Sequence, residues 1–125
     1  MILDTNALSD WAKADAALLA VMPADHLLVL PVVVIGEYLY GVQRSRERAT
    51  LKSWLDRTIQ AVSVGVITLA TADSYAAVRN MLRLKGRPIP ANDAWIAALA
   101  LQHRLPLLSR DAHYDFVDGL TRVTW

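Results

Sequence analysis

Residues 27–43, LLVLPVVVIGEYLYGVQ, contain the pattern that decides the fold. The first four, residues 27–30, are continuous, apolar and short, which is typical of a strand buried on both faces of a parallel sheet. Pro31 then fits the first turn of a helix, which we expect to run through Glu37 toward Gln43. The β-branched residues at 32–35 weaken the case for a helix at its start, because such side chains lose freedom there.

The same alternation of strand and helix continues on both sides of this stretch. Further strands are expected at residues 1–3, 64–69, 105–109 and 121–125. Helices are expected from an Asn6 cap through Trp11, over 14–21, over 46–59 and from a Thr71 cap to Gly86. A further helix over 93–103 is expected to start from Asn92 or Pro90, and a short turn or helix is expected at 111–115. This order predicts an α/β fold with a parallel sheet, whose sites lie beyond the carboxyl ends of the strands.

The composition limits the classes of protein that this chain can be. A length of 125 residues suits one domain over residues 1–125, and 54% apolar residues argue against disorder. The absence of cysteine excludes disulfides, thiol catalysis and zinc–thiolate sites, and it is compatible with a cytoplasmic location. We expect no signal peptide and no contact with membranes, since the longest uncharged apolar stretch, residues 27–36, is too short to span a bilayer.

The net charge of +1 says little about partners, but the basic residues gather in two runs. The first run contains Arg44, Arg46, Arg48, Lys52 and Arg57, and the second contains Arg79, Arg83, Lys85 and Arg87. If several acids face inward, the outer surface is more basic than the total suggests. The alternative interpretation is two ordinary solvated helix faces.

Four acidic residues lie in or beside apolar segments, where carboxylates are costly unless they are paired or bound to a cation. They are Asp4, Glu37, Asp93 and Asp111. No Lys or Arg lies within three positions of the first three. Two like charges about 4 Å apart repel by roughly 4 kcal/mol at an effective dielectric constant of about 20. If the sheet edge brings the four together, their counter-charge is a hard divalent cation, Mg²⁺ or Mn²⁺.

Each acid also has a simpler explanation. Asp4 could cap a helix, and Glu37 could be an exposed residue on a surface helix. An acid in the first turn of a helix, such as Asp93, is favoured by the helix dipole alone. Asp111 could be a turn residue or a partner for Arg110.

The end of the chain offers three more candidate residues. Asp115 is a possible fifth acid that we expect to be peripheral to the site. His113 and Tyr114 are expected to be packing or surface residues rather than ligands.

Short motifs across the whole chain resemble one known family. They are ILDTN at residues 2–6, GEYLYG at 36–41, GRPIP at 86–90 followed by Asn92 and Asp93, IAA at 96–98, LLSRD at 107–111, and His113 with Tyr114. In this order they resemble the PIN-domain ribonucleases, specifically the VapC-type toxins of toxin–antitoxin pairs.

The resemblance implies a three-layer α/β/α fold with a central, mostly parallel sheet, and a Mg²⁺- or Mn²⁺-dependent endoribonuclease that inhibits translation or growth. Asp4, Glu37, Asp93 and Asp111 match the family's metal-site acids. The supporting positions are matched by Thr5, Asn6 and Ser109. The family often has Thr where Ser109 stands, and often has Ser or Thr near residues 30–33, where this chain has Leu-Pro-Val-Val.

The resemblance also implies partners. Such toxins form homodimers and are neutralised by a small VapB-type antitoxin, which contacts operator DNA. We expect RNA phosphates to contact Arg44, Arg46 and Arg87, and an antitoxin segment to enter the acidic site. The dimer interface is expected on the apolar helix face near Trp54 and Leu55, or on the helix that carries Tyr75.

Three other classes of protein fit less well. A phosphoacceptor receiver domain needs two acids after its first strand, an Asp after its middle strand and a late Lys. Here residues 66–69 end without Asp, and no Lys lies near Ser109. A phosphatase with an aspartyl nucleophile needs a second Asp at position 6, where Asn6 stands. The third alternative is a catalytically silent PIN fold that only binds RNA or protein.

Overall fold

A five-stranded parallel sheet forms the centre of the molecule. The computed structural model describes residues 1–24 and 27–125. The strands are β1 (Ile2–Leu3), β2 (Val29–Pro31), β3 (Ser63–Gly65), β4 (Leu107–Leu108) and β5 (Arg122–Val123). Their order is β3-β2-β1-β4-β5, and all four neighbouring pairs are parallel. The parallel sheet that the alternation of strands and helices predicts is therefore confirmed.

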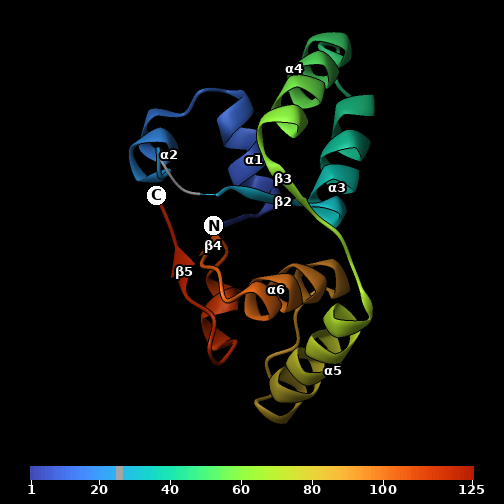
Figure 1. The fold of residues 1–125 in the computed structure, drawn as a ribbon, viewed down its shortest axis with the longest axis vertical. Helices are drawn as coiled ribbons and strands as arrows, with labels where there is room; N and C mark the ends of the chain where they lie inside the picture. The colour runs from blue at the N-terminus through green and yellow to red at the C-terminus, as the bar shows by residue number, and fades with distance from the viewer. Residues whose placement is uncertain (25–26) are drawn as a thin grey trace.

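Helices cover both faces of this sheet. They are α1 (Thr5–Ala12), α2 (Ala16–Val21), α3 (Val32–Gln43), α4 (Arg48–Ala61), α5 (Leu69–Leu84) and α6 (Ala91–His103), and a 3₁₀ helix, η1 (Ala112–Phe116), precedes β5. The helices α1 to α4 lie on one side of the sheet, and α5 and α6 lie on the other (Figure 1). This is the expected three-layer α/β/α arrangement.

The core is centred on β1 and β4, the two shortest inner strands. Ile2, Leu3, Leu107 and Leu108 are all fully buried, because helices pack on both faces of these strands. Burying each such side chain contributes about 1.5–3 kcal/mol to stability. Both strands end abruptly at a polar residue, Asp4 after β1 and Ser109 after β4, and these two residues are buried as well. The apolar core therefore stops where the candidate site begins.

Two strand predictions were wrong in their limits. The predicted strand at 27–30 begins two residues later, because pairing with the central strand starts at Val29, opposite Ile2, while Leu27 is 61% exposed. The predicted strand at 64–69 ends at Gly65, opposite Pro31, where its only neighbour β2 also ends. Leu69 is instead the first residue of α5.

Two predicted helix caps were also wrong, whereas Pro90, one of the two predicted starts of the last helix, is confirmed as its cap. Asp4, rather than Asn6, is the N-cap of α1, because its side chain accepts a hydrogen bond from the Thr5 amide. Thr68 caps α5, and Thr71 is the third helical residue, which completes a capping box with it. The last helix begins at Ala91 rather than Asp93, after Pro90. In the described ranges 1–24 and 27–125, no helix is both long and apolar enough to cross a membrane.

Candidate active site

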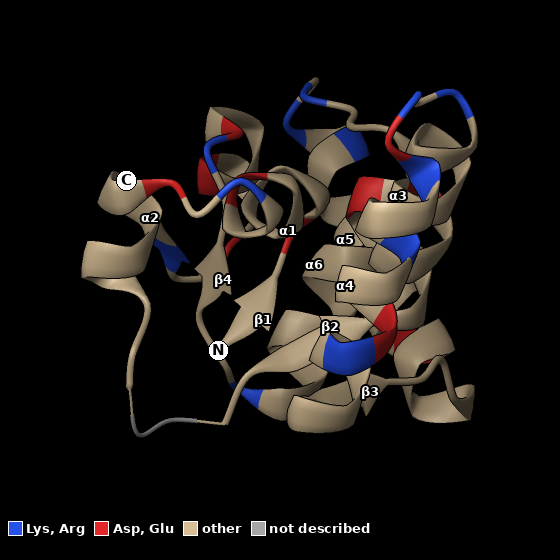
Figure 2. Cartoon of the chain, turned by 90° about the horizontal axis from the view of Figure 1, so that it is seen from above, with Lys and Arg blue, Asp and Glu red and all other residues tan. Residues whose placement is uncertain are grey.

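Four acids meet beyond the carboxyl ends of β1 and β4, as the parallel sheet predicts. Asp4 directly follows β1, and Asp111 follows β4 after two intervening residues. Glu37 lies on the second turn of α3, and Asp93 lies in the first turn of α6. Figure 2 shows the arrowheads of β1 and β4 pointing toward the end of the molecule where acidic segments gather. The electrostatic fields of Asp4, Glu37 and Asp111 all act on Asp93, so the four form one coupled group.

Two polar side chains fix Asp4 and Asp111 relative to each other. The Ser109 hydroxyl donates to Asp4 Oδ2 at 2.6 Å, and Ser109 Oγ accepts from the Asp111 amide at 3.0 Å. The Asn6 side-chain amide donates to Asp4 Oδ2 at 2.9 Å and to Asp111 Oδ2 at 3.1 Å. These bonds connect the start of α1 to the loop after β4, across more than 100 positions of sequence.

Glu37 is held from two other elements. Its carboxylate accepts hydrogen bonds from the Thr5 hydroxyl on α1 and from the Asn92 side-chain amide on α6. Because α3 and α6 lie on opposite faces of the sheet, the Asn92–Glu37 bond joins the two helical layers at the site (Figure 1). Sequence reasoning assigned Asn92 no role in the site. Its position next to Asp93, on the same helical turn, was the signal that could have indicated one.

Asp93 has a different neighbour. His113 Nε2 on η1 lies 3.1 Å from Asp93 Oδ2, and the His113 ring packs against Tyr114 with the ring centroids 4.7 Å apart. Burial, together with the nearby Asp4 charge, raises the pKa of Asp93 to about 6, although His113 acts in the opposite direction. Burial also raises the pKa of Asp4, with Asp111 and Glu37 adding to the effect. His113 packs against Tyr114, in agreement with the prediction, and it also contacts Asp93, which the sequence did not indicate.

Tyr114 places a protonated donor beneath the acids. The side chain is fully buried, and its hydroxyl has no hydrogen-bond partner in the part of the chain that the structure describes. Burial raises the pKa of this phenol far above its usual range, and the charges of Asp4, Asp93 and Asp111 raise it further. The hydroxyl therefore keeps its proton at every physiological pH. Tyr114 packs in the core as predicted, but it also borders the site.

Neutral side-chain donors hold Asp4, Glu37 and Asp111, and His113 contacts Asp93. Within residues 1–24 and 27–125, none of the four acids forms an ion pair with Lys or Arg, and His113, which is neutral unless protonated, is the one basic side chain within ion-pair distance of them. Two acids next to the group are paired with arginine. Asp10 binds Arg110 at 2.7 Å, so Arg110 is not a partner of Asp111. Asp115 accepts two bonds from Arg122, at 2.7 and 2.8 Å, which keeps it apart from the site.

The donors of the site fit a hard divalent cation by their chemistry. Carboxylate oxygens with nearby amide and hydroxyl groups are the ligands that Mg²⁺ and Mn²⁺ prefer. As they are placed, no three acidic or histidine side chains in the described residues converge at the spacing of a metal site. Their oxygens accept bonds from Thr5, Asn6 and Asn92 instead. Metal binding would therefore need side-chain movements that bring carboxylate oxygens of the four acids closer to one another.

The three arginines predicted to contact RNA lie on exposed loops. Arg44 caps the end of α3, Arg46 lies in the loop before α4, and Arg87 lies in the loop between α5 and α6. The Arg87 guanidinium stands 4.6 Å from the centre of the Phe116 ring. Figure 2 shows basic segments on loops at the same end of the molecule as the acids.

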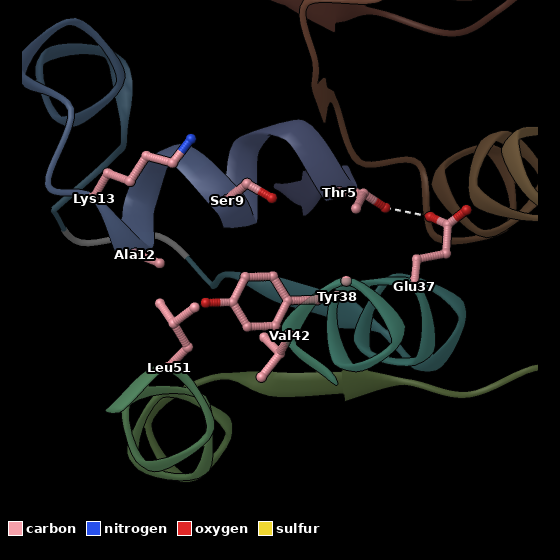
Figure 3. A pocket seen from close by; sticks show the side chains of 9 residues that line it. Thr5, Ser9, Ala12, Lys13, Glu37, Tyr38, Val42 and Leu51 are labelled. Atoms are coloured by element: carbon pink, nitrogen blue, oxygen red, sulfur yellow. Dashed lines mark hydrogen bonds between the residues drawn. The ribbon is translucent and has the colours of Figure 1, made fainter. Parts of the chain in front are cut away.

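A cavity of about 280 Å³ opens beside the site, between α1, α3 and α4. Thr5 and Glu37 form one end of it, and Lys13 and Leu51 form the other (Figure 3). Its walls are mostly apolar and include Val42. The cavity therefore leads from a carboxylate of the site to an apolar surface.

The apolar face of α4 is used inside the molecule. Leu55 is fully buried, and the Trp54 ring packs edge-on against Trp11, with ring centroids 5.7 Å apart. Because α1 and α3 already cover these side chains, the structure favours the other predicted interface over the one near Trp54 and Leu55. The helix that carries Tyr75 remains as the alternative.

Comparison with known proteins decides the family. The family model described as "PIN domain" matches residues 1–120. The chain belongs to the PIN-domain family. The resemblance seen in the sequence motifs is thus confirmed, and the fold agrees with it.

Several relatives of this PIN domain carry informative names. It is 28% identical to "Ribonuclease VapC5" of Mycobacterium tuberculosis, over 98% of this chain and 90% of the relative. It is 28% identical to "Toxin FitB" of Neisseria gonorrhoeae, over 89% of this chain and 87% of the relative. Among solved structures, VapBC2 from Rickettsia felis bound to a DNA fragment from its promoter matches with a TM-score of 0.89 at 22% identity, covering 99% of this chain and 97% of that one.

Proposed function

We propose that this PIN domain is a Mg²⁺- or Mn²⁺-dependent endoribonuclease, the VapC-type toxin of a type II toxin–antitoxin pair, which inhibits translation or growth in the cytoplasm. The observation that carries the proposal is the group of four carboxylates at the sheet edge, none of which has a Lys or Arg partner in the described residues. The names of the curated relatives support it.

In this proposal, Asp4, Glu37, Asp93 and Asp111 hold the cation, directly or through water. When bound, such an ion supplies a water of lowered pKa for attack on phosphorus and neutralises charge on the phosphoryl oxygens. Ser109 and Asn6 orient Asp4 through bonds of 2.6 and 2.9 Å, and Thr5 and Asn92 orient Glu37. The bridge that Asn6 makes between Asp4 and Asp111 sets the separation of two ligands.

RNA binding is assigned to the exposed arginines around this edge. Arg44, Arg46 and Arg87 have no carboxylate partner in the part of the chain that the structure describes. Their guanidinium groups can therefore bind backbone phosphates, which give affinity with little sequence preference. Such binding weakens steeply with added salt.

The proposed inhibitor is a VapB-type antitoxin. Several structural relatives are described as complexes of this kind, and some of them are bound to DNA. We place an antitoxin segment in the cavity beside Glu37, with apolar side chains near Val42 and Leu51 and a basic side chain at the carboxylates (Figure 3). Operator DNA then contacts this toxin only through the antitoxin.

We also propose a homodimer, with its interface at the start of α5. Val66, Ile67 and Leu69 are 56%, 40% and 84% exposed, and they follow the edge strand β3 without interruption. Covering these side chains would remove apolar surface from water. Replacing Leu69 with Lys should shift the protein toward monomer in light scattering, and an unchanged dimer would exclude this face.

The test of the nuclease is cleavage of total cellular RNA by the purified protein, with Mn²⁺ and with EDTA. We expect discrete fragments that depend on the metal and that disappear in Asp4→Asn, which keeps the shape of the side chain and can still cap α1. The matched control is Asp115→Asn, because Asp115 is paired with Arg122 outside the site. Cleavage by Asp4→Asn at the wild-type rate would refute the mechanism. A folded protein that neither binds Mn²⁺ nor cuts RNA would point to a silent PIN fold.

A further inference from the structure

A second cavity lies on the α5 side of the sheet. It measures about 490 Å³ and is bordered by Arg79, Asn80 and Arg83 of α5 and by Pro88 and Ile89 of the loop that follows. We propose that this cavity binds a backbone phosphate of the RNA strand that flanks the cleavage site. The inference rests on the proposed function, and it adds Arg79 and Arg83 to the RNA-binding surface.

The two arginines have donors to spare for an anion. Arg79 Nη1 donates to the Tyr75 hydroxyl at 2.8 Å, and Arg83 Nη2 donates to Asn80 Oδ1 at 2.9 Å. Both acceptors are neutral, and in the described ranges neither arginine has a carboxylate partner. A guanidinium carries five N–H donors, and it binds phosphate oxygens in pairs. Phosphate is thus an anion whose geometry fits these two groups.

The placement of the charges is unfavourable unless an anion binds. Arg79 and Arg83 are four positions apart on one helix, where like charges destabilise each other. The helix dipole favours Arg83 in the last turn of α5, but it does not favour Arg79 one turn earlier. The next base in the sequence, Lys85, is neutralised by Asp118 at 2.5 Å. The positive charges of Arg79 and Arg83 therefore remain without a carboxylate partner in the described residues, at the edge of the cavity.

The cavity is joined to the acidic site by a short segment. After Ile89 the chain passes through Pro90, the cap of α6, to Asn92, which binds Glu37. Three residues span at most about 11 Å even when fully extended. Arg87, already assigned to RNA, lies in the same loop. An RNA strand with its cleaved phosphate at the acids can therefore place a neighbouring phosphate at this cavity.

An aromatic stack holds Arg79 in place. The Arg79 guanidinium stands 5.6 Å from the centre of the Tyr75 ring, and Tyr75 stacks on Trp95 with ring centroids 3.8 Å apart and an angle of 15° between the rings. Trp95 follows Asp93 by two positions on α6. A guanidinium that is fixed before binding loses less freedom when it takes up phosphate.

The test is the affinity for a labelled, single-stranded RNA of mixed sequence, measured by fluorescence anisotropy in EDTA over a series of salt concentrations. We expect the double variant Arg79→Ala/Arg83→Ala to bind about tenfold more weakly than the wild type. The slope of log affinity against log salt should become shallower by about 0.7, the contribution of the one phosphate that the cavity binds on a single strand. The matched control is Arg57→Ala, because Arg57 on α4 also donates to a neutral side chain one turn earlier, Ser53.

Equal affinity and equal slope in the double variant and the wild type would overturn the inference, as would a wild type that binds no RNA. A double variant that binds RNA normally but loses an acidic protein partner would assign the cavity to that partner instead. Because the assay contains EDTA, it does not depend on cleavage. If the wild type bound RNA but never cut it, and the double variant lost this binding, the phosphate site would be supported and the proposed nuclease activity would be refuted.

Discussion

Asp111 and Asp115 lie four positions apart on one segment, yet only Asp115 forms an ion pair with an arginine in the described residues. Asp115 accepts two bonds from the Arg122 guanidinium, and this pairing lowers its pKa. Among residues 1–24 and 27–125, the Asp111 carboxylate accepts a hydrogen bond only from the neutral side-chain amide of Asn6, although Arg110 is its neighbour in sequence. Arg110 instead turns to Asp10 on α1 and stands 5.2 Å from the Trp125 ring. Arg110 and Arg122 thus pair with acids around the site, whereas the acids inside it have no Lys or Arg partner in the described residues.

The largest expected difference between the two regions is in catalysis. Asp111→Asn should lower RNA cleavage by at least about 100-fold, because losing even an outer partner of a metal ligand costs 10–100-fold. Asp115→Asn should stay close to the wild-type rate. The measurement is the initial cleavage rate of one RNA in Mn²⁺ for both variants. If both lost activity equally, the division between paired and unpaired acids would have no functional meaning.

The contact between His113 and Asp93 should have the next largest effect. His113→Asn removes the ring that lies 3.1 Å from Asp93, so we expect Mn²⁺ affinity to fall about tenfold, as for other partners that orient a ligand. Titration calorimetry measures this directly. His103→Asn is the control, because His103 is exposed at the other end of α6. Unchanged Mn²⁺ affinity in His113→Asn would mean that this histidine only packs.

The uncompensated acids should also give the metal-free protein an unusual pH dependence. The folded-state pKa of Asp93 is raised from 3.8 to about 6, so the folded protein binds this proton more tightly than the unfolded chain does. Its contribution to stability is therefore largest at low pH and is lost as the pH rises through about 6. We expect the Tm of the wild type in EDTA to fall between pH 5 and pH 7, and to fall by more than the Tm of Asp93→Asn. Mn²⁺ should raise the Tm most at pH 7, because protons compete with the metal at pH 5.

The smallest expected effect is on the paired side. Asp115→Ala breaks a pair whose carboxylate is 52% exposed, so the cost in unfolding free energy should be below about 1 kcal/mol. Urea unfolding measures it. A much larger loss would show that Arg122, which also donates to the Ser109 carbonyl at 3.1 Å, supports the site through this pair.

The fold could be predicted from sequence because its signal is local. Short apolar runs alternate with helices, and the carboxyl ends of parallel strands share one edge, so Asp4 and Asp111 had to approach each other. The limits of β3 could not be predicted in this way. Residues 64–69 look like one strand, but β2, the neighbour that ends the pairing, is only three residues long.

The parts of the site that were missed depend on distant contacts. His113 on η1 contacts Asp93 on α6, and Arg110 pairs with Asp10, which lies 100 positions earlier in the sequence. The packing of Trp11 and Tyr38 against Trp54 on α4 could not be predicted for the same reason. No local pattern records which helix will cover a given face.

The brevity of β1 has one more consequence. This central strand pairs with β2 at a single residue and with β4 at two, so its backbone ladder alone is a weak tether. The bonds from Ser109 and Asn6 to Asp4 add a side-chain tether at its end. Metal binding at the site should therefore stabilise the backbone hydrogen bonds in the middle of the sheet. Amide hydrogen exchange of Leu3 and Leu108 should slow when Mn²⁺ is added, so that exchange at these core positions would report metal binding.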